Sequence, residues 1–260
     1  MKKIALGIEY NGSAYNGWQK QKHGTGVQEP LEKALSYVAD EEIKVVCAGR
    51  TDSGVHAASQ VVHFETNAER DEQAWRQGTN TKLPNDICVN WAMPVDDEFH
   101  ARFSALKRYY RYVICTRRVQ PAILNNLVSW DYRSFDTQRM QQAAACLRGE
   151  HDFSSYRAVH CQAHSPIRTV HQLEVRRSGD FIFIDIEANA FLHHMVRNIT
   201  GVLMAIGAGE KPVNWAEEVL AHRDRRLGGV TAPPHGLYFM KVSYPDEFMI
   251  PEIEVRNLFP

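Results

Sequence analysis

Short stretches in which apolar residues alternate with polar ones, or form a brief apolar run, predict β-strands along the whole chain. One pair of strands is separated only by Ser178-Gly179-Asp180, which predicts a hairpin over residues 170–189. The other predicted strands are residues 3–10, 43–47, 60–66, 87–95, 108–116 and 236–244.

Apolar residues spaced three or four apart predict helices between these strands. In residues 27–40, Val27, Leu31, Leu35 and Val38 fall on one helical face, and Pro30 is tolerated in the first turn. Asp136 is a plausible N-cap for a helix that ends near Gly149. The other predicted helices are residues 71–83, 189–209 and 214–223.

The mixture of strands, hairpins and helices predicts an α+β fold with a mainly antiparallel central sheet and helices packed on one face. Two similar α+β halves are expected, dividing near residue 105. Residues 1–105 would carry the polar turn around Asp52, and residues 106–260 would complete the active-site cleft. Because the sequence has no Pro/Ser-rich linker, the halves are expected to share a continuous core.

The composition is that of a globular protein, with 44% hydrophobic and 23% charged residues among 260. No apolar run approaches the roughly 18 residues that a membrane helix requires. Glu9 and Tyr10 interrupt the first apolar run too early for a signal peptide, so a cytoplasmic location without membrane attachment is expected. The five cysteines include no CxxC pair, which argues against a disulfide framework or a zinc ribbon.

The formal net charge of −1 differs from the strongly basic charge that many nucleic-acid-binding proteins carry. The charges are segregated, however. Between Phe99 and Trp130 there are six Lys/Arg residues and no acidic residue. A basic face on a neutral protein is therefore possible.

The segment CAGRTDSGVHA, Cys47 to Ala57, places charged residues at a turn between two predicted strands. It can be a plain polar turn in which Asp52 caps a backbone N–H. It can also be a catalytic turn, because Arg50 lies two residues from Asp52, could pair with it and would keep its carboxylate ionised as a nucleophile or base. The flanking glycines would let the backbone approach a partner closely.

A metal site with Asp52 and His56 as ligands is a third possibility, but no HxH, HExxH or DxD pattern completes it. His193 and His194 would point about 100° apart on a helix. The loop with His160, Cys161 and His164 lacks a second ligand pair. No metal is therefore expected.

The segment GRTDSGVHA resembles the signature of the TruA-type tRNA pseudouridine synthases, with Ser53 where alanine is common in that family. The resemblance runs from about residue 3 to residue 245. Further blocks that match in the same order are YNGSAYNGWQ, VQEPLEKAL, FHARFSA, RYYRYVI, HDFSSYRA, NAFLHHMVRNITG and GLYFMKVSY.

This resemblance implies isomerisation of uridine to pseudouridine at positions 38, 39 and 40 of the tRNA anticodon arm. It implies a pseudouridine synthase fold, no cofactor, no metal, and a homodimer whose cleft holds the tRNA. Asp52 corresponds to the catalytic nucleophile of the family. A catalytically idle RNA-binding protein of the same fold, and a metal-dependent hydrolase using Asp52 and His56, are the competing functions.

The resemblance also assigns roles to other residues. Arg50 corresponds to the arginine that flips the target base, and Tyr110 to the tyrosine that stacks on it and can move the C5 proton. Arg197 corresponds to the partner of Asp52, and Leu237 to the apolar residue that lines the uracil pocket. Each also has a structural alternative: a surface arginine that pairs only with Asp52, strand packing, a helix-edge arginine and a core leucine, respectively.

The segment FHARFSA resembles a tRNA-contact segment of the family. In it, His100 and Arg102 can meet phosphates while the two phenylalanines pack. The candidate contacts there are Phe99, His100, Ala101, Arg102 and Phe103. Weaker candidates, for which a solvated side chain is equally expected, are Arg70, Arg118, His160, Cys161, Gln162, Ala163 and His164.

Overall fold

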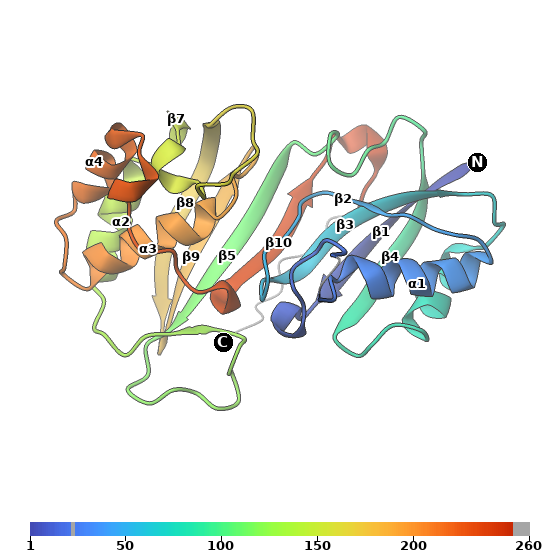
Figure 1. The fold of residues 1–260 in the computed structure, drawn as a ribbon, viewed down its shortest axis with the longest axis horizontal. Helices are drawn as coiled ribbons and strands as arrows, with labels where there is room; N and C mark the ends of the chain where they lie inside the picture. Colours follow the sequence, from blue (N-terminus) through green and yellow to red (C-terminus); the bar gives the residue numbers. More distant parts are fainter. Residues whose placement is uncertain (22–23, 252–260) are drawn as a thin grey trace. The chain divides into compact units, whose positions relative to one another are not determined.

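The chain forms two compact units in the computed structural model, which describes residues 1–21 and 24–251 (Figure 1). Of the described residues, the first unit contains those of 1–106 together with 238–251, and the second contains 107–237. The last strand therefore belongs to the first unit, although it follows the second unit in sequence. The assignment of residues 1–105 and 106–260 to two functional halves stays a prediction.

The first unit is a mainly antiparallel sheet with one long helix lying across it (Figure 1). Its strands follow the order β4-β1-β3-β10, with β2 paired to β3 and with β10 parallel to β3. The elements are β1 (Lys2–Tyr10), a 3₁₀ turn (Gly12–Ala14), α1 (Gln28–Ala39), β2 (Val46–Cys47), β3 (His56–Thr66), a π-helical turn (Ala74–Gly78), β4 (Ile87–Val95), β10 (Leu237–Ser243) and a 3₁₀ turn (Asp246–Phe248).

The core of the first unit lies between α1 and the sheet. Leu31 and Leu35 of α1 are fully buried, as are Leu6 and Ile8 of β1. Burying each such side chain contributes about 1.5–3 kcal/mol to the free energy of folding. The sheet is therefore a firm support for the loop between β2 and β3.

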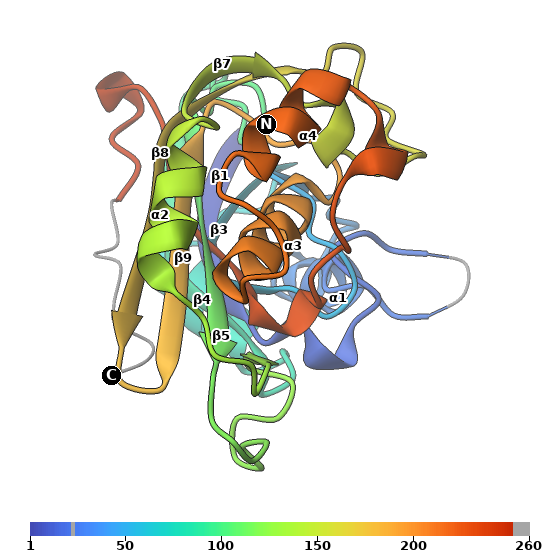
Figure 2. The same ribbon diagram turned by 90° about the vertical axis from the view of Figure 1, so that its left-hand side faces the viewer.

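The second unit is also mainly antiparallel, with strand order β5-β9-β8-β7 and β6 parallel to β5. Figure 2 shows α2 running alongside β8, and α2 also contacts α3. The elements are β5 (Lys107–Cys115), β6 (Ser129–Trp130), α2 (Thr137–Ala145), β7 (Gly149–Asp152), β8 (Ile167–Ser178), β9 (Phe181–Ala188), α3 (Met195–Gly207), α4 (Trp215–His222) and 3₁₀ turns at Ser154–Tyr156, Arg225–Leu227 and Pro234–Gly236.

The predicted α+β fold class with a mainly antiparallel sheet is confirmed. The hairpin around Gly179 is present, and Asp136 caps α2 by accepting hydrogen bonds from the backbone N–H groups of Gln138 and Arg139. In the described part of the chain, no helix combines the length and the apolar character that crossing a membrane would require.

Two predicted elements are shorter than expected. In residues 43–47 only Val46 and Cys47 form a strand, because the N–H groups of Ile43 and Val45 donate instead to side chains of α1, Ser36 and Glu32. The helix predicted over residues 189–209 begins only at Met195.

Two other helix predictions need correction. The helix that begins after Asp136 ends at Ala145, and Gly149 instead opens β7 with a φ of +99°. Residues 71–83 contain a π-helical turn, Ala74–Gly78, flanked by short helical residues instead of one regular α-helix.

The stretch without acidic residues does not form a basic face as a whole, because strand pairing brings acids to it. Arg111 on β5 is buried and bonds Asp185 on β9, with Nε at 2.7 Å from Oδ1. Lys107 pairs with Glu187 at 3.1 Å. The cations of β5 are thus neutralised by acids of β9. These partners are more than 70 residues apart in the sequence, so a local charge pattern does not reveal them.

Candidate functional site

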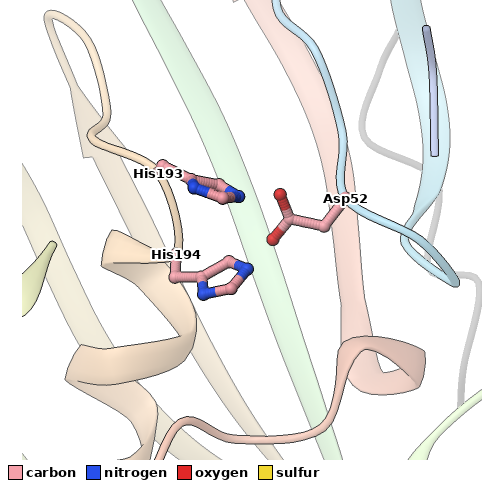
Figure 3. Close-up of side chains that lie close together, drawn as sticks. All are labelled: Asp52, His193 and His194. Atoms are coloured by element: carbon pink, nitrogen blue, oxygen red, sulfur yellow. The ribbon is translucent and has the colours of Figure 1, made fainter. Parts of the chain in front are cut away.

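Asp52 projects from the loop between β2 and β3 (Figure 3). The backbone on both sides of it is held by hydrogen bonds. Trp18 N donates to Thr51 O at 3.0 Å, and Gly54 N donates to Tyr15 O at 3.2 Å. The loop between β1 and α1 therefore fixes the position from which the Asp52 carboxylate extends.

Thr51 is anchored by its side chain as well. Its Oγ1 shares a hydrogen bond of 2.7 Å with the hydroxyl of Tyr10, a residue whose burial raises its pKa above the ordinary value. Gly17 has a φ of +90°, and a Cβ there would lie 2.6 Å from Thr51 O. Only glycine allows this close approach, which explains the Asn-Gly pair before Trp18.

Arg50 is exposed and forms no ion pair within the described residues, so the predicted pairing with Asp52 is wrong. An attraction between an exposed arginine and a half-buried carboxylate at the surface is worth only about 0–1 kcal/mol and does not hold a flexible arginine. Ser53 is exposed, and its Oγ donates to Tyr15 O at 3.2 Å.

His56 has a structural position at the start of β3. It is 1% exposed, its Nδ1 accepts a hydrogen bond from Gly12 N at 3.1 Å, and its ring stacks on Tyr238 at 4.6 Å. Within the described residues it joins no cluster of three potential metal ligands. This geometry does not support His56 as the metal ligand of a hydrolase.

Arg197 lies in the first turn of α3, in the second unit, and is half-buried. Its Nε donates to Ala232 O at 2.8 Å, while Ala232 N donates back to Arg197 O at 3.1 Å. The guanidinium is therefore oriented by backbone and does not reach freely into water as a helix-edge arginine would. Its predicted pairing with Asp52 stays a prediction.

The three tyrosines of β5 have distinct environments. Tyr112 is fully buried, and its hydroxyl donates to Pro233 O at 2.8 Å. The hydroxyl of Tyr109 donates to Asp185, on the opposite face of the strand. Tyr110 packs edge-to-face on Phe191 at 4.9 Å. The predicted alternation of these side chains is confirmed.

Leu237 is the last residue of the second unit and the first residue of β10. It is 5% exposed, and its backbone N–H donates to Pro234 O. Leu237 thus follows directly on the segment that contacts Arg197 and Tyr112.

His193 and His194 lie in the turn before α3, not on a helix (Figure 3). His194 has a φ of +62°, and the two rings are 4.0 Å apart with an interplanar angle of 44°. The expectation that a helix would direct them about 100° apart is therefore wrong. The left-handed backbone at His194 brings the rings side by side.

The predicted tRNA-contact segment presents only part of its side chains to solvent. Phe99 and Ala101 are fully buried, whereas Phe103 is 75% exposed and Arg102 is exposed. The two phenylalanines pack in different ways: Phe99 lies in the core, whereas the exposed Phe103 ring contacts the His100 ring at 4.3 Å. His100 Nδ1 accepts from the N–H groups of Arg102 and Phe103, which fixes the turn.

The weaker candidates lie on exposed loops. Arg70 donates to Val38 O at 3.0 Å, and Arg118 has no hydrogen bond or ion pair to a described residue. Cys161 and Ala163 are half-buried, while His160, Gln162 and His164 are exposed. Their contact with tRNA stays a prediction.

Comparison with known proteins identifies the class. The sequence model of the family described as tRNA pseudouridine synthase matches residues 7–104 and 143–245. The chain belongs to this family, and it is an isomerase, a tRNA pseudouridine synthase. A solved chain of a Cbf5-Nop10-Gar1 complex aligns over 78% of this chain and 54% of its own, with 11% identity and a TM-score of 0.32, too distant to support an argument.

Curated relatives cover nearly the whole chain. A tRNA pseudouridine synthase A of Hydrogenovibrio crunogenus is 56% identical over 99% of this chain and 98% of its own length. A tRNA pseudouridine synthase A of Pseudomonas aeruginosa is 58% identical over 96% of this chain and 88% of its own. The predicted family membership is therefore confirmed.

Sequence reasoning missed the residues that hold the site residues in place. Thr51, beside Asp52, acts through its backbone oxygen and its neutral hydroxyl, and Ala232 holds Arg197 through its backbone oxygen. Because these groups are uncharged, no charge pattern in the sequence predicts them. The available sequence signal is a glycine where the backbone approaches closely, such as Gly17 at Thr51 O.

Proposed function

We propose that this enzyme isomerises uridines 38, 39 and 40 in the anticodon arm of tRNA, with Asp52 as the nucleophile and without a cofactor or metal. We further propose that it acts in the cytoplasm as a homodimer. The observation that carries the assignment of Asp52 is the loop that fixes the backbone on both sides of this carboxylate. A catalytic group must be held in a productive geometry before the substrate arrives.

The reaction breaks the N1–C1′ glycosidic bond, rotates the uracil and forms a C5–C1′ bond. The proton on C5 leaves to solvent, and N1 gains one, so atoms balance without a redox partner. An ionised carboxylate can attack C1′, add to C6 of the base, or remove the C2′ proton. All three routes end with loss of the C5 proton.

Arg50 is assigned to flipping of the target base. Extrusion of a stacked base costs a few kcal/mol, which a side chain filling the vacated space can offset. The support is that Arg50 is exposed beside Asp52 and is not engaged by an acid in the described chain.

Tyr110, Arg197 and Leu237 are assigned to the base and to the carboxylate. Tyr110 offers a ring for stacking, and its hydroxyl can move the C5 proton. Arg197, held by Ala232 O, can stabilise the charge of Asp52, and Leu237 can line an apolar pocket that retains the detached uracil.

Release of tritium from tRNA labelled as [5-³H]uridine tests the proposal. Wild type should release label with EDTA present, while Asp52→Asn should bind tRNA and release no label above background. [5-³H]Uridine-labelled transcripts in which uridines 38, 39 and 40 are replaced one at a time identify the modified positions, because each replacement of a substrate uridine lowers the amount of label released. Ser53→Ala, an exposed neighbour, is the matched control and should retain activity.

Two outcomes would contradict the proposal. Binding of tRNA without release of label by wild type would favour a catalytically idle RNA-binding protein. Loss of wild-type activity in EDTA, restored by a divalent metal, would favour metal-dependent chemistry.

A further inference from the structure

A polar network in the second unit joins α3 to the segment of residues 225–233. Asn198, the residue after Arg197, is 1% exposed and uses both ends of its amide. Its Nδ2 donates to Tyr156 O at 2.8 Å. Its Oδ1 accepts from Arg225 Nη2 at 3.0 Å and from Thr231 Oγ1 at 2.6 Å.

Arg225 closes this network. The same Nη2 also donates to Thr231 Oγ1 at 2.9 Å, so Arg225, Thr231 and Asn198 bond one another in a ring. Burial lowers the pKa of Arg225 below its ordinary value, and the residue has no ion pair within the described chain. Its neighbour Arg226 is exposed and pairs with Asp224 at 2.6 Å.

A half-buried guanidinium without a carboxylate is unfavourable unless its hydrogen bonds compensate for lost water. Here the acceptors of Arg225 are neutral groups on two different elements. Arg225 therefore links those elements geometrically and does not neutralise a buried acid.

The segment that Arg225 holds lies directly on α3. A Cβ at Gly201 would lie 1.8 Å from Val230 O, so the backbone of the segment touches the helix at a glycine. Two residues further on, Ala232 exchanges two hydrogen bonds with Arg197. The network that begins at Arg225 thus ends at the guanidinium of Arg197.

We propose that Arg225 is a positioning residue for Arg197. Through Asn198 and Thr231 it holds residues 228–233 on α3, so that Ala232 O directs the Arg197 guanidinium. Arg225 itself touches neither substrate nor the reacting atoms. The inference rests on the role proposed above for Arg197, and it extends that role to a residue outside the site.

The first experiment compares Arg225→Met with Arg226→Met, the same change at the adjacent exposed residue. Thr231→Val keeps the side-chain shape, removes only the hydroxyl, and serves if Arg225→Met does not fold. Tritium release from anticodon-arm uridines gives kcat and KM, filter binding gives the Kd for tRNA, and thermal melting gives Tm.

Arg225→Met and Thr231→Val should lower kcat about tenfold, because small misplacements of a site group have large kinetic effects. KM and Kd should stay within about twofold, and Arg226→Met should match wild type.

A double-mutant cycle with Arg197→Lys separates positioning from general loss of stability. Lysine has no N–H group at the Nε position, so the side-chain bond to Ala232 O loses its fixed geometry in that background, while the backbone bond from Ala232 N remains. Arg225→Met should then change kcat by less than about twofold, because residues that act through one path are not additive. A purely structural defect would instead lower kcat equally in both backgrounds.

Three results would overturn the inference: unchanged kcat in Arg225→Met and Thr231→Val, equal losses in both backgrounds, or a weaker Kd with a smaller salt dependence. The last would mean that Arg225 contacts an RNA phosphate. Failure of the proposed function looks different. In that case wild type releases no label, or Arg197→Lys is as active as wild type.

Discussion

Thr51, the residue before Asp52, has both its carbonyl oxygen and its hydroxyl engaged, by Trp18 N and by the Tyr10 hydroxyl. Asn198, the residue after Arg197, likewise uses its whole amide. Neutral hydrogen bonds keep their geometry at any salt concentration and require close approach. They are suited to fixing the backbone beside a charged side chain that has to remain available to substrate.

Replacing Thr51 by valine should lower the free energy of unfolding by about 1–3 kcal/mol, because the buried hydroxyl of Tyr10 would lose its hydrogen bond to Thr51. Urea denaturation followed by circular dichroism measures the change. Ser53→Ala, which removes a hydrogen bond of 3.2 Å from an exposed residue to Tyr15 O, should stay within about 0.5 kcal/mol of wild type. Equal stability of the two variants would show that the Tyr10–Thr51 bond does not anchor the loop.

The environment of His63 predicts that the free energy of unfolding depends on pH. Burial lowers its pKa to about 4, with a further contribution from His100, and its Nδ1 accepts from Ala101 N. In the unfolded chain, His63 has the ordinary histidine pKa of about 6.5. The neutral His63 ring therefore contributes its full stabilisation of the folded state above about pH 6.5, and this stabilisation is lost as the pH falls towards 4.

Urea unfolding of wild type and His63→Gln between pH 4 and 7.5 measures this dependence. Glutamine can still accept from Ala101 N but does not titrate, so the variant should lose less stability on acidification. His151→Gln, whose ring contacts Arg148 O at an exposed position, should follow wild type. Parallel curves for all three proteins would contradict the assignment.

At the scale of elements, the sequence pattern predicts strands and helices well where side chains alone decide them. The alternation of β5 and the apolar face of α1 are both recovered. The pattern fails where side chains accept hydrogen bonds from the backbone. Ser36 and Glu32 accept from the N–H groups of residues 43 and 45, and the hydrophobic periodicity does not predict these bonds. The late start of α3 follows from the left-handed backbone of His194, which a helical pattern also hides.

A substitution at Gly201 tests whether the contact between α3 and residues 225–233 is needed for stability and activity. Gly201→Ala would place a methyl group against Val230 O and push the segment from the helix. We expect a loss of about 1–3 kcal/mol in unfolding free energy and a lower kcat. Gly78→Ala is the matched control, because its Cβ would meet only the tip of Val38 at 3.3 Å. If both variants retain full activity, the position of the segment does not matter for catalysis.

At the scale of the molecule, the resemblance of ordered motifs identified the family, whereas composition alone indicated little more than a globular protein. The residues proposed for catalysis are far apart in the sequence: Asp52 belongs to the first unit, and Tyr110, Arg197 and Leu237 belong to the second. Residues far apart in sequence cannot be grouped from local patterns. The ion pairs of Lys107 with Glu187 and of Arg111 with Asp185 show that a run of cations in the sequence does not by itself form a basic surface, because strand pairing can bring acids to it.

A net charge of −1 means that binding of tRNA depends on local cations and not on the overall field of the protein. Arg102 is exposed in the turn fixed by His100, with its guanidinium 5.4 Å from the Phe103 ring centroid. If it meets a phosphate, Arg102→Gln should weaken binding of different tRNAs uniformly. The slope of log K against log salt should then fall by about one, while kcat at saturating tRNA stays unchanged. Arg226→Gln is the control, because Arg226 is exposed and already paired with Asp224. An equal change of slope in that variant would assign the effect to the net charge of the protein instead of to the Phe99–Phe103 segment.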